Sequence, residues 1–182
     1  MTARRTATDS LLPHIALGLL DAGPRHGYGL YQDFAEAFGS LWRAGRSKFY
    51  ATLADLQAAG HLTAEMEPQP NSPPRKVYAL TDSGRTALQA WLAEPAPTPR
   101  ALRVVIPVKL RLYDLLGWPG VGALLDAQTR VCADRLARER AQAAGDDPVD
   151  ALVSDLRQRQ LTALIEWLAA CRTTLTRSND DA

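Results

Sequence analysis

The sequence predicts a mainly α-helical protein, in which a helical domain that carries a two-stranded β ribbon is followed by a second domain made only of helices. Three observations lead to this fold class. Residues 46–60 have the apolar periodicity of a helix and are followed at once by two strand-like runs, at 61–66 and 75–80. Alternating prolines at 95–99 favour an extended linker. From residue 100 onward, apolar residues recur at helical spacing almost to the end of the chain.

Three helices are expected before the ribbon. The first follows a capping pair at 9–10 and ends before the Gly-Pro stop at 23–24, and the second begins at His26 and ends at Gly39. Three short helices of this kind supply the compact core that a helix-turn-helix requires.

The third helix carries its apolar residues on one face and ends at Gly60, where a left-handed residue is needed. Phe49, Leu53 and Leu56 follow the spacing i, i+4, i+7 and are expected to be buried. We expect Arg46, Lys48 and Thr52 on the other faces of the helix.

The ribbon turns within a polar segment at 69–74, whose prolines lack the backbone donors that a strand ladder needs. A further helix is capped by Thr81-Asp82 and ends near Glu94. We therefore expect a domain at 1–94, a linker at 95–99 and a helical domain at 100–182.

The helical domain is expected to contain three elements. Pro107 should kink or split the first of them, a second helix follows Gly120, and Asp147 with Pro148 starts the last. The last helix has a long apolar stripe for which one small domain offers too little partner surface, so we expect pairing with a second copy. The stripe consists of Val149, Val153, Leu156, Leu164, Trp167, Cys171 and Leu175.

Composition excludes several classes of protein. The chain has 182 residues, 46% of them hydrophobic, and a formal net charge of +1, which argues against indiscriminate coating of nucleic acid. Two cysteines are too few for a disulfide framework, and no long apolar run or signal segment stands out, so a cytoplasmic protein is expected with no membrane partner. The hydrolase, phosphate-loop and metalloprotease motifs are lacking, so we expect no enzyme, catalytic residue or cofactor.

Basic residues gather around the third helix and the ribbon. Of the eight basic side chains in residues 1–80, five are Arg43, Arg46, Lys48, Arg75 and Lys76. A helix followed directly by a ribbon with a basic tip is the layout of a winged helix-turn-helix, in which the ribbon is the wing.

Three motifs resemble those of the PadR family of bacterial transcriptional regulators. They are Leu17-Gly18-Leu19-Leu20 with Gly23-Pro24 and His26-Gly27-Tyr28, then Phe49-Tyr50-x-x-Leu53-x-x-Leu56-x-x-x-Gly60-x-Leu62, and finally Pro74-Arg75-Lys76-Val77-Tyr78-Ala79-Leu80-Thr81-Asp82-Ser83-Gly84-Arg85. The resemblance covers roughly residues 11–94. Where many members carry Gly-Ser before this helix pattern, this chain has Ser47-Lys48, which suggests a different operator sequence.

The resemblance implies a sequence-specific DNA-binding regulator, a ligand-responsive repressor that acts as a homodimer on a palindromic double-stranded operator. A ligand that favours one arrangement of the dimer would change the separation of the two DNA-binding heads. The alternative is a winged-helix adaptor that binds protein without specific DNA binding. The residues expected at DNA are Tyr28, Arg46, Ser47, Lys48, Tyr50, Thr52, Arg75 and Lys76.

Each candidate residue also has an ordinary structural explanation. Ser47 is suited to a helix cap, Tyr50 to half-burial beside Phe49, and Arg46 and Lys48 to plain solvation.

The tryptophans and cysteines have alternatives of the same kind. Trp91, Trp118 and Trp167 would suit a small aromatic effector, which some family members bind, or plain core and dimer packing. Cys132 and Cys171 lie on apolar stripes typical of inert buried thiols. The three histidines are too scattered for a metal site.

Overall fold

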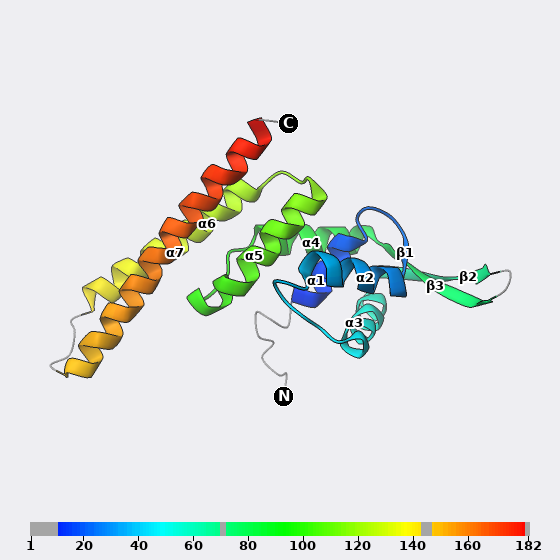
Figure 1. Ribbon diagram of the computed structural model, residues 1–182, viewed down its shortest axis with the longest axis horizontal. Coiled ribbons are helices and arrows are strands. Elements are labelled where there is room, and N and C mark those ends of the chain that lie inside the picture. The colour runs from blue at the N-terminus through cyan, green and yellow to red at the C-terminus, as the bar shows by residue number, and fades with distance from the viewer. Residues whose placement is uncertain (1–10, 70–71, 143–146, 181–182) are drawn as a thin grey trace. The chain divides into compact units, whose positions relative to one another are not determined.

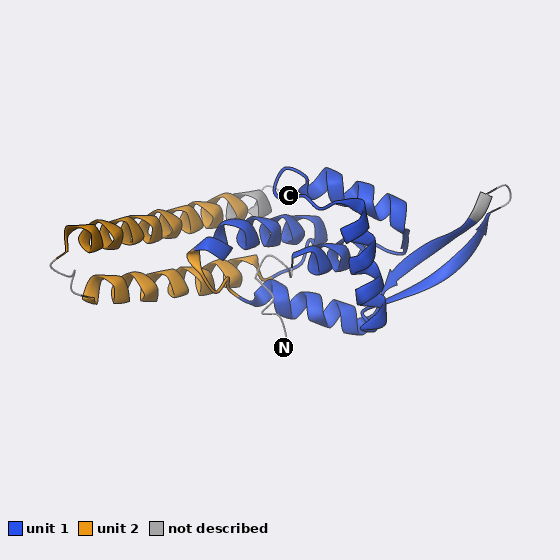
Figure 2. Ribbon diagram, turned by 90° about the horizontal axis from the view of Figure 1, so that it is seen from below, with its two compact units in different colours: residues 1–94, 100–119 blue, residues 95–99, 120–182 orange. Residues whose placement is uncertain are grey.

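The computed structural model describes residues 11–69, 72–142 and 147–180, so the expected capping pair at 9–10 lies outside the described residues (Figure 1). The chain forms two compact units (Figure 2). The first unit contains residues 1–94 and 100–119, and the second contains residues 95–99 and 120–182. The elements in chain order are α1 (Leu11–Leu19), β1 (Arg25–His26), α2 (Gly27–Phe38), α3 (Arg46–Ala58), β2 (Leu62–Gln69), β3 (Ser72–Leu80), α4 (Asp82–Ala93), α5 (Pro99–Leu116), α6 (Val121–Ala141) and α7 (Pro148–Asp180).

The core of the first unit is aromatic where α2 meets α3. The ring centroids of Phe34 and Phe49 lie 5.3 Å apart, and Trp42 packs edge-on against Phe34 at 6.1 Å. Phe49, Leu53 and Leu56 are all buried, as their spacing predicts. One apolar face therefore holds α3 on the body of the unit and leaves its other faces outward.

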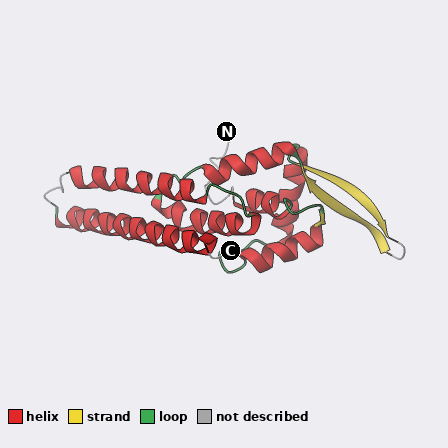
Figure 3. Cartoon of the chain, turned by 90° about the horizontal axis from the view of Figure 1, so that it is seen from above, coloured by secondary structure: helices red, strands yellow, loops and turns green. Residues whose placement is uncertain are grey.

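The expected two-stranded ribbon is present as β2 and β3, the long pair of strands drawn in yellow in Figure 3. β1 adds a third strand to it, so the antiparallel sheet has the order β1-β3-β2. β1 pairs Arg25 with Tyr78 and His26 with Val77. A strand of two residues is too short to display the alternation by which strands are predicted, which explains why the sequence pattern missed it. The consequence is that the wing, formed by β2 and β3, is tied to the start of α2.

The base of the wing depends on Thr81, which caps α4 as predicted. Its hydroxyl accepts from the Gly84 amide at 3.1 Å and donates to the Gly60 carbonyl at 2.8 Å. Gly60 has a φ of +75°, the left-handed conformation expected from the sequence. One side chain thus joins the end of α3, the end of β3 and the start of α4.

Helix α5 belongs with the first unit, although the sequence places its residues in the second domain. The reason is close packing against α1, where the Leu112 side chain occupies the space that a side chain at Gly18 would need. Pro107 neither splits nor ends the helix, which runs unbroken from Pro99 to Leu116. Its missing amide removes one intrahelical hydrogen bond, and burial of the flanking Ile106 and Val108 favours the continuous helix.

A buried lysine closes the end of α4. Lys109 is 1% exposed, and its Nζ donates to the carbonyls of Trp91 and Glu94 and lies 4.5 Å from the centroid of the Trp91 ring. Both carbonyls lie at the end of α4, where few backbone donors remain, and that of Trp91 also accepts from the amide of the capping residue Glu94 at 3.3 Å. Burial lowers the pKa of Lys109 to about 8, against the opposing influence of the Glu94 carboxylate.

In the second unit, α6 packs along α7 and holds the proline-rich segment (Figure 2). The Gln128 side chain accepts from the Ala96 amide at 2.6 Å and donates to the Ala96 carbonyl at 3.3 Å. Both Ala96 and Gln128 are buried. The linker is therefore clamped to α6 by a bidentate amide. Asp147 accepts from the Val149 amide at 2.7 Å, which confirms the predicted start of α7.

The α7 residues that are buried in the second unit lie outside the expected apolar stripe. Leu161 and Leu168 are buried, whereas four residues of the stripe, Val149, Val153, Leu156 and Trp167, are exposed. The other three, Leu164, Cys171 and Leu175, are half-buried.

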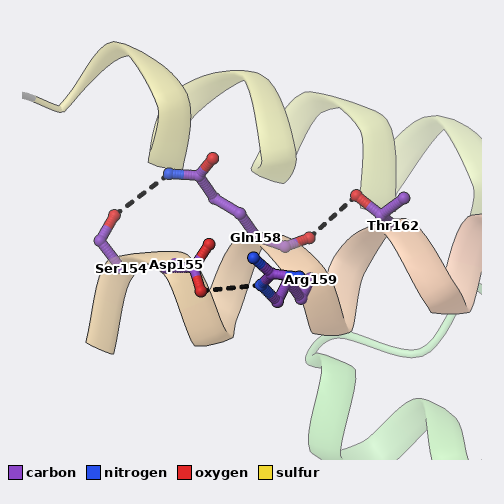
Figure 4. A network of polar contacts seen from close by, with 5 residues as sticks. All are labelled: Ser154, Asp155, Gln158, Arg159 and Thr162. Atoms are coloured by element: carbon purple, nitrogen blue, oxygen red, sulfur yellow. Dashed lines mark hydrogen bonds and ion pairs between the residues drawn. The ribbon is translucent and has the colours of Figure 1, made fainter. Parts of the chain in front are cut away.

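The side of α7 next to α6 carries half-buried polar residues in its first half (Figure 4). There, Gln158 donates to the Ser154 hydroxyl at 3.2 Å, and the Thr162 hydroxyl donates to the Gln158 carbonyl at 3.0 Å. Asp155 pairs with Arg159 at 2.7 Å on the same helix. The first half of α7 thus turns polar groups toward its neighbour and apolar groups toward solvent.

No helix in the described parts of the chain combines the length and the apolar character needed to cross a membrane.

We expect the buried Lys109 to give the fold a distinctive dependence on pH. Its pKa is about 8 in the folded protein and 10.5 ordinarily, so between these values the unfolded chain holds the extra proton and stability rises with pH. The free energy of unfolding, relative to a Lys109→Met variant, should increase by up to about 1.4 kcal/mol per pH unit in this window.

Urea unfolding from pH 7 to 10 measures this difference. Burial raises the pKa of both Cys132 and Cys171 above the ordinary 9.0, which opposes the trend above pH 9, but the variant keeps both thiols and so controls for them. Parallel stability curves for the two proteins would contradict the prediction.

Candidate nucleic-acid interface

The first turn of α3 has an unusually positive local environment. Gly45 is the capping residue and provides no side-chain hydrogen bond to the free amides of the helix. Arg46, Ser47 and Lys48 follow, all exposed, and the turn contains no acidic residue. Free amides and the helix dipole already favour an anion at this end, and two cations strengthen that preference.

Helix α2 contributes tyrosine rings beside this turn. Tyr28 is 56% exposed, and the Arg46 guanidinium lies 5.8 Å from its ring centroid and 5.4 Å from that of Tyr31. The Gln32 amide donates to the Tyr28 hydroxyl at 3.3 Å. These contacts hold Arg46 across the start of α2, so α2 and α3 present one continuous polar face.

The wing brings two more cations to the same region. Arg75 and Lys76 are exposed on β3, and the Lys76 Nζ lies 5.3 Å from the ring centroid of Tyr78. In the strand register, Arg75 is opposite Glu67 and Lys76 is opposite Met66. Glu67 therefore lowers the local positive charge at Arg75 more than at Lys76.

A recess of about 450 Å³ joins the three elements. Arg75 and Lys76 of the wing line it together with aromatic side chains of α2, α3 and β3. The His26 Nδ1 atom is buried without a hydrogen-bond partner among the described residues. The full lining, which we call the recess, consists of His26, Gly27, Tyr28, Tyr50, Arg75, Lys76 and Tyr78.

Close packing at Gly27 shapes this recess. A side chain at Gly27 would lie 2.7 Å from the Tyr50 ring and 3.3 Å from the Tyr78 ring, so glycine allows both rings to approach the backbone of α2. Burial, followed by the nearby Tyr50, raises the pKa of the Tyr78 hydroxyl. Tyr78 therefore lines the recess as an uncharged side chain, while Tyr50 is 39% exposed to solvent.

Among the described residues, no ion pair neutralises the basic side chains of this face. Arg46, Lys48, Arg75 and Lys76 form no ion pair with any residue in the described part of the chain, although six ion pairs occur elsewhere in it. Four exposed cations, free helix amides and a tyrosine-lined recess are suited to bind a polyanion with a partly apolar backbone.

Two of the expected residues behave differently from the sequence interpretation. Thr52 is only 5% exposed and its hydroxyl donates to the Lys48 carbonyl at 2.9 Å, because it follows Phe49 by three positions and falls on the buried face. Thr52 is therefore removed from the candidate interface. Ser47 is not the helix cap, since Gly45 holds that position and Ser47 lies in the first turn.

Three members of the recess are not among the residues that the sequence predicts at DNA, namely His26, Gly27 and Tyr78. The sequence pattern places His26 and Gly27 at the start of a helix and Tyr78 in a strand. Successive side chains of a strand point to opposite faces of the sheet, so Tyr78 and Val77 face opposite ways. This alternation could have indicated that Tyr78 is buried. Nothing in the sequence indicates that His26 meets the wing, because that contact depends on the two-residue strand β1.

The three tryptophans occupy unrelated environments. Trp91 is in the core, with its ring stacked on His14 at 4.4 Å. Trp118 is half-buried, with the Arg85 guanidinium 5.8 Å from its ring centroid. Trp167 belongs to the second unit and is 37% exposed. Trp91 thus has the packing role, while an effector role for Trp118 and Trp167 stays a prediction.

Comparison with known proteins gives consistent results for the first unit. Residues 16–90 match the transcriptional regulator PadR-like family. The chain is 34% identical over 93 residues to the negative transcriptional regulator PadR of Bacillus subtilis, covering 51% of each protein, so it spans about half the length of that relative.

A second relative matches over a longer stretch. It is a probable transcriptional regulator of Mycobacterium tuberculosis, 33% identical over 154 residues, which are 84% of this chain and 67% of the relative. Among solved structures, that of Bacillus subtilis PadR in complex with operator DNA is similar at 24% identity, with a TM-score of 0.47 and coverage of 90% of this chain and 97% of the other.

Proposed function

The chain belongs to the PadR-like family of transcriptional regulators, and on this basis we propose that it binds a specific operator sequence in double-stranded DNA through α3 and the wing. The observation that carries the proposal is the set of four cations without ion-pair partners among the described residues, gathered at the start of α3 and on β3. Unpaired cations on a protein surface favour a polyanion, because binding releases counterions from the DNA.

Within this interface, α3 and the wing have different roles. Lys48 and Ser47 lie in the first turn of α3, which would enter the major groove, where base edges are read. Arg75 and Lys76 would contact the backbone or the adjacent minor groove, where negative potential attracts basic side chains. The tyrosines of the recess would pack against the sugar-phosphate chain.

We also propose that the protein acts as a homodimer through α7. Five large apolar side chains of this helix are exposed, namely Val149, Leu152, Val153, Leu156 and Trp167. The side turned toward α6 is instead partly polar, with Ser154, Gln158 and Thr162 half-buried there. A helix with its apolar side in water favours burial against another copy.

A dimer of this kind would place two recognition helices on one duplex. Their half-sites should then lie about 10 base pairs apart, or a multiple of that, in an imperfect palindrome. Since the Bacillus relative is named as a negative regulator, we propose repression as the outcome, relieved by a small ligand. An adaptor that binds protein instead of DNA is the competing function, and a shift assay on the protein's own promoter fragment at two salt concentrations separates the two.

Replacing Lys76 by Ala should weaken binding to specific and nonspecific DNA alike. The expected change is a decrease of about one unit in the slope of log affinity against log salt concentration, because one phosphate contact is lost. Fluorescence anisotropy at several salt concentrations measures the slope. Arg103→Ala is the matched control, because it removes an exposed cation from α5 and should leave the slope unchanged.

Replacing Lys48 by Ala should instead change sequence preference. We expect a loss of roughly 1–3 kcal/mol that is confined to one base pair of the operator. Binding measured against a set of single-base operator variants reveals it. Identical behaviour of the Lys48 and Lys76 variants would refute the division of roles between α3 and the wing.

Replacing Leu156 by Glu should dissociate the dimer. A charge placed in an apolar interface loses hydration without gaining a partner, so the shift from dimer to monomer should be visible by light scattering after size-exclusion chromatography. Ala169→Glu places the same charge on an exposed residue of α7 outside the apolar side and should remain dimeric. A wild-type chain that is monomeric at micromolar concentration would refute the dimer proposal.

A further inference from the structure

A second cavity lies entirely within the first unit, away from the recess. It has a volume of about 610 Å³ and is bounded by the end of α1, by α2 and by the end of α5. Sites for small organic ligands fall in the range of about 300–1,000 Å³. The size and concave shape of the cavity therefore suit a small-molecule ligand better than the surface of a partner protein.

Part of the lining of this cavity is apolar. Leu19, Leu115 and Leu116 contribute aliphatic surface, and Leu115 is 51% exposed even though it lies at the cavity. An exposed leucine beside a concave surface is stabilised when an apolar group covers it, by about 25 cal/mol for each Å² removed from water.

The charged residues of the lining leave a negative charge once their ion pairs are taken into account. Asp21 is paired with Arg85, Asp33 with Arg25 at 3.3 Å, and Arg111 with Asp114 at 3.2 Å. The carboxylate that remains is Glu36, which forms no ion pair with any residue that the structure describes. The lining of the cavity thus combines one carboxylate without an ion pair among the described residues with aliphatic side chains.

We infer that this cavity binds an amphipathic organic cation, with its amine beside Glu36 and its apolar body against Leu115 and Leu116. A monovalent cation neutralises Glu36 and leaves the existing ion pairs intact, whereas an anion would meet the Glu36 carboxylate and two guanidinium groups whose charge Asp33 and Asp114 already balance. The positive charge of the ligand is inferred from the Glu36 carboxylate, and its apolar body is inferred from the exposed Leu115 side chain.

The cavity also reaches the wing through Arg25. This residue lines the cavity, and its backbone forms β1, which pairs Arg25 with Tyr78 of the recess. A ligand beside Glu36 lies one turn of α2 from Asp33, whose ion pair with Arg25 adjoins the strand pairing that ties the wing to α2. This regulatory part of the inference, in which the cation weakens operator binding, rests on the proposed DNA-binding function.

Binding is tested first on the full chain without DNA. We expect 4-phenylbutylamine to bind saturably in calorimetry, and 4-phenylbutyrate, which has the same body and the opposite charge, to bind about tenfold more weakly or not at all. Glu36→Gln should reduce amine affinity about tenfold, whereas Asp55→Asn removes an exposed carboxylate outside the cavity and should have no effect.

The ligand site would be refuted by equal binding of the two probes or by unchanged amine affinity in Glu36→Gln. Ala37→Leu, which narrows the cavity, should abolish binding of the amine; retained binding would place it elsewhere and overturn the assignment.

The coupling to the wing is tested separately, on the operator complex. Saturating amine should weaken operator affinity, and the operator should weaken amine affinity by the same factor, because coupling between two binding equilibria is reciprocal. An operator affinity that does not change with amine would overturn the coupling. A chain that binds amine but no DNA at all would refute the proposed function and leave the ligand site intact.

Discussion

The contact between Phe34 of α2 and Phe49 of α3 is the interaction on which the candidate DNA face depends. The centroids of the two rings lie 5.3 Å apart, and both side chains are fully buried. This contact fixes how the two helices cross. Because buried aromatic rings fit their surroundings closely, the helix cannot rotate without disturbing the core. Arg46, Ser47 and Lys48 lie immediately before Phe49 and are therefore held outward by a residue that never touches solvent.

The electrostatics of the interface follow from this packing. A helix start with two basic residues is unfavourable in an isolated helix, since like charges meet the positive end of the dipole. The protein tolerates the arrangement because burial of the apolar face of α3 stabilises the helix independently. The basic residues of the wing and of α3 then lie on one surface. The Glu67 carboxylate, opposite Arg75 in the strand register, lowers the positive charge locally at that residue. The candidate DNA face is therefore positively charged, although the whole chain carries a formal charge of only +1.

Much of the fold could be predicted from periodic and capping signals, because both are local. The burial of Phe49, Leu53 and Leu56, the cap at Thr81 and the start of α7 at Asp147 all follow from residues close in sequence. The errors concern contacts between distant residues. β1 exists only because β3 pairs with it. Thr52 is the exception, because its place three residues after Phe49 is a local signal that puts it on the buried face of α3.

The same limit explains what the sequence could not indicate about the α5 and α7 helices. An apolar stripe identifies that a helix is amphipathic but not which neighbour it covers, and the α7 residues buried in the second unit, Leu161 and Leu168, lie outside the expected stripe. Lys109 has no distinguishing sequence signal, because a buried lysine depends on carbonyl groups from another helix. The recess likewise requires β1, α3 and β3 to meet, and only the tertiary structure brings them together.

The division of the chain into units has a consequence for how such regulators diversify. The polypeptide leaves the first unit after Glu94, returns at Arg100 and leaves again after Pro119. A genetic exchange at the proline segment would transplant a head without α5, and so without the lysine that closes α4 and the leucine that packs on Gly18. Successful shuffling of heads among related proteins should therefore have its crossover points near Gly120, so that α5 is inherited with the head it completes.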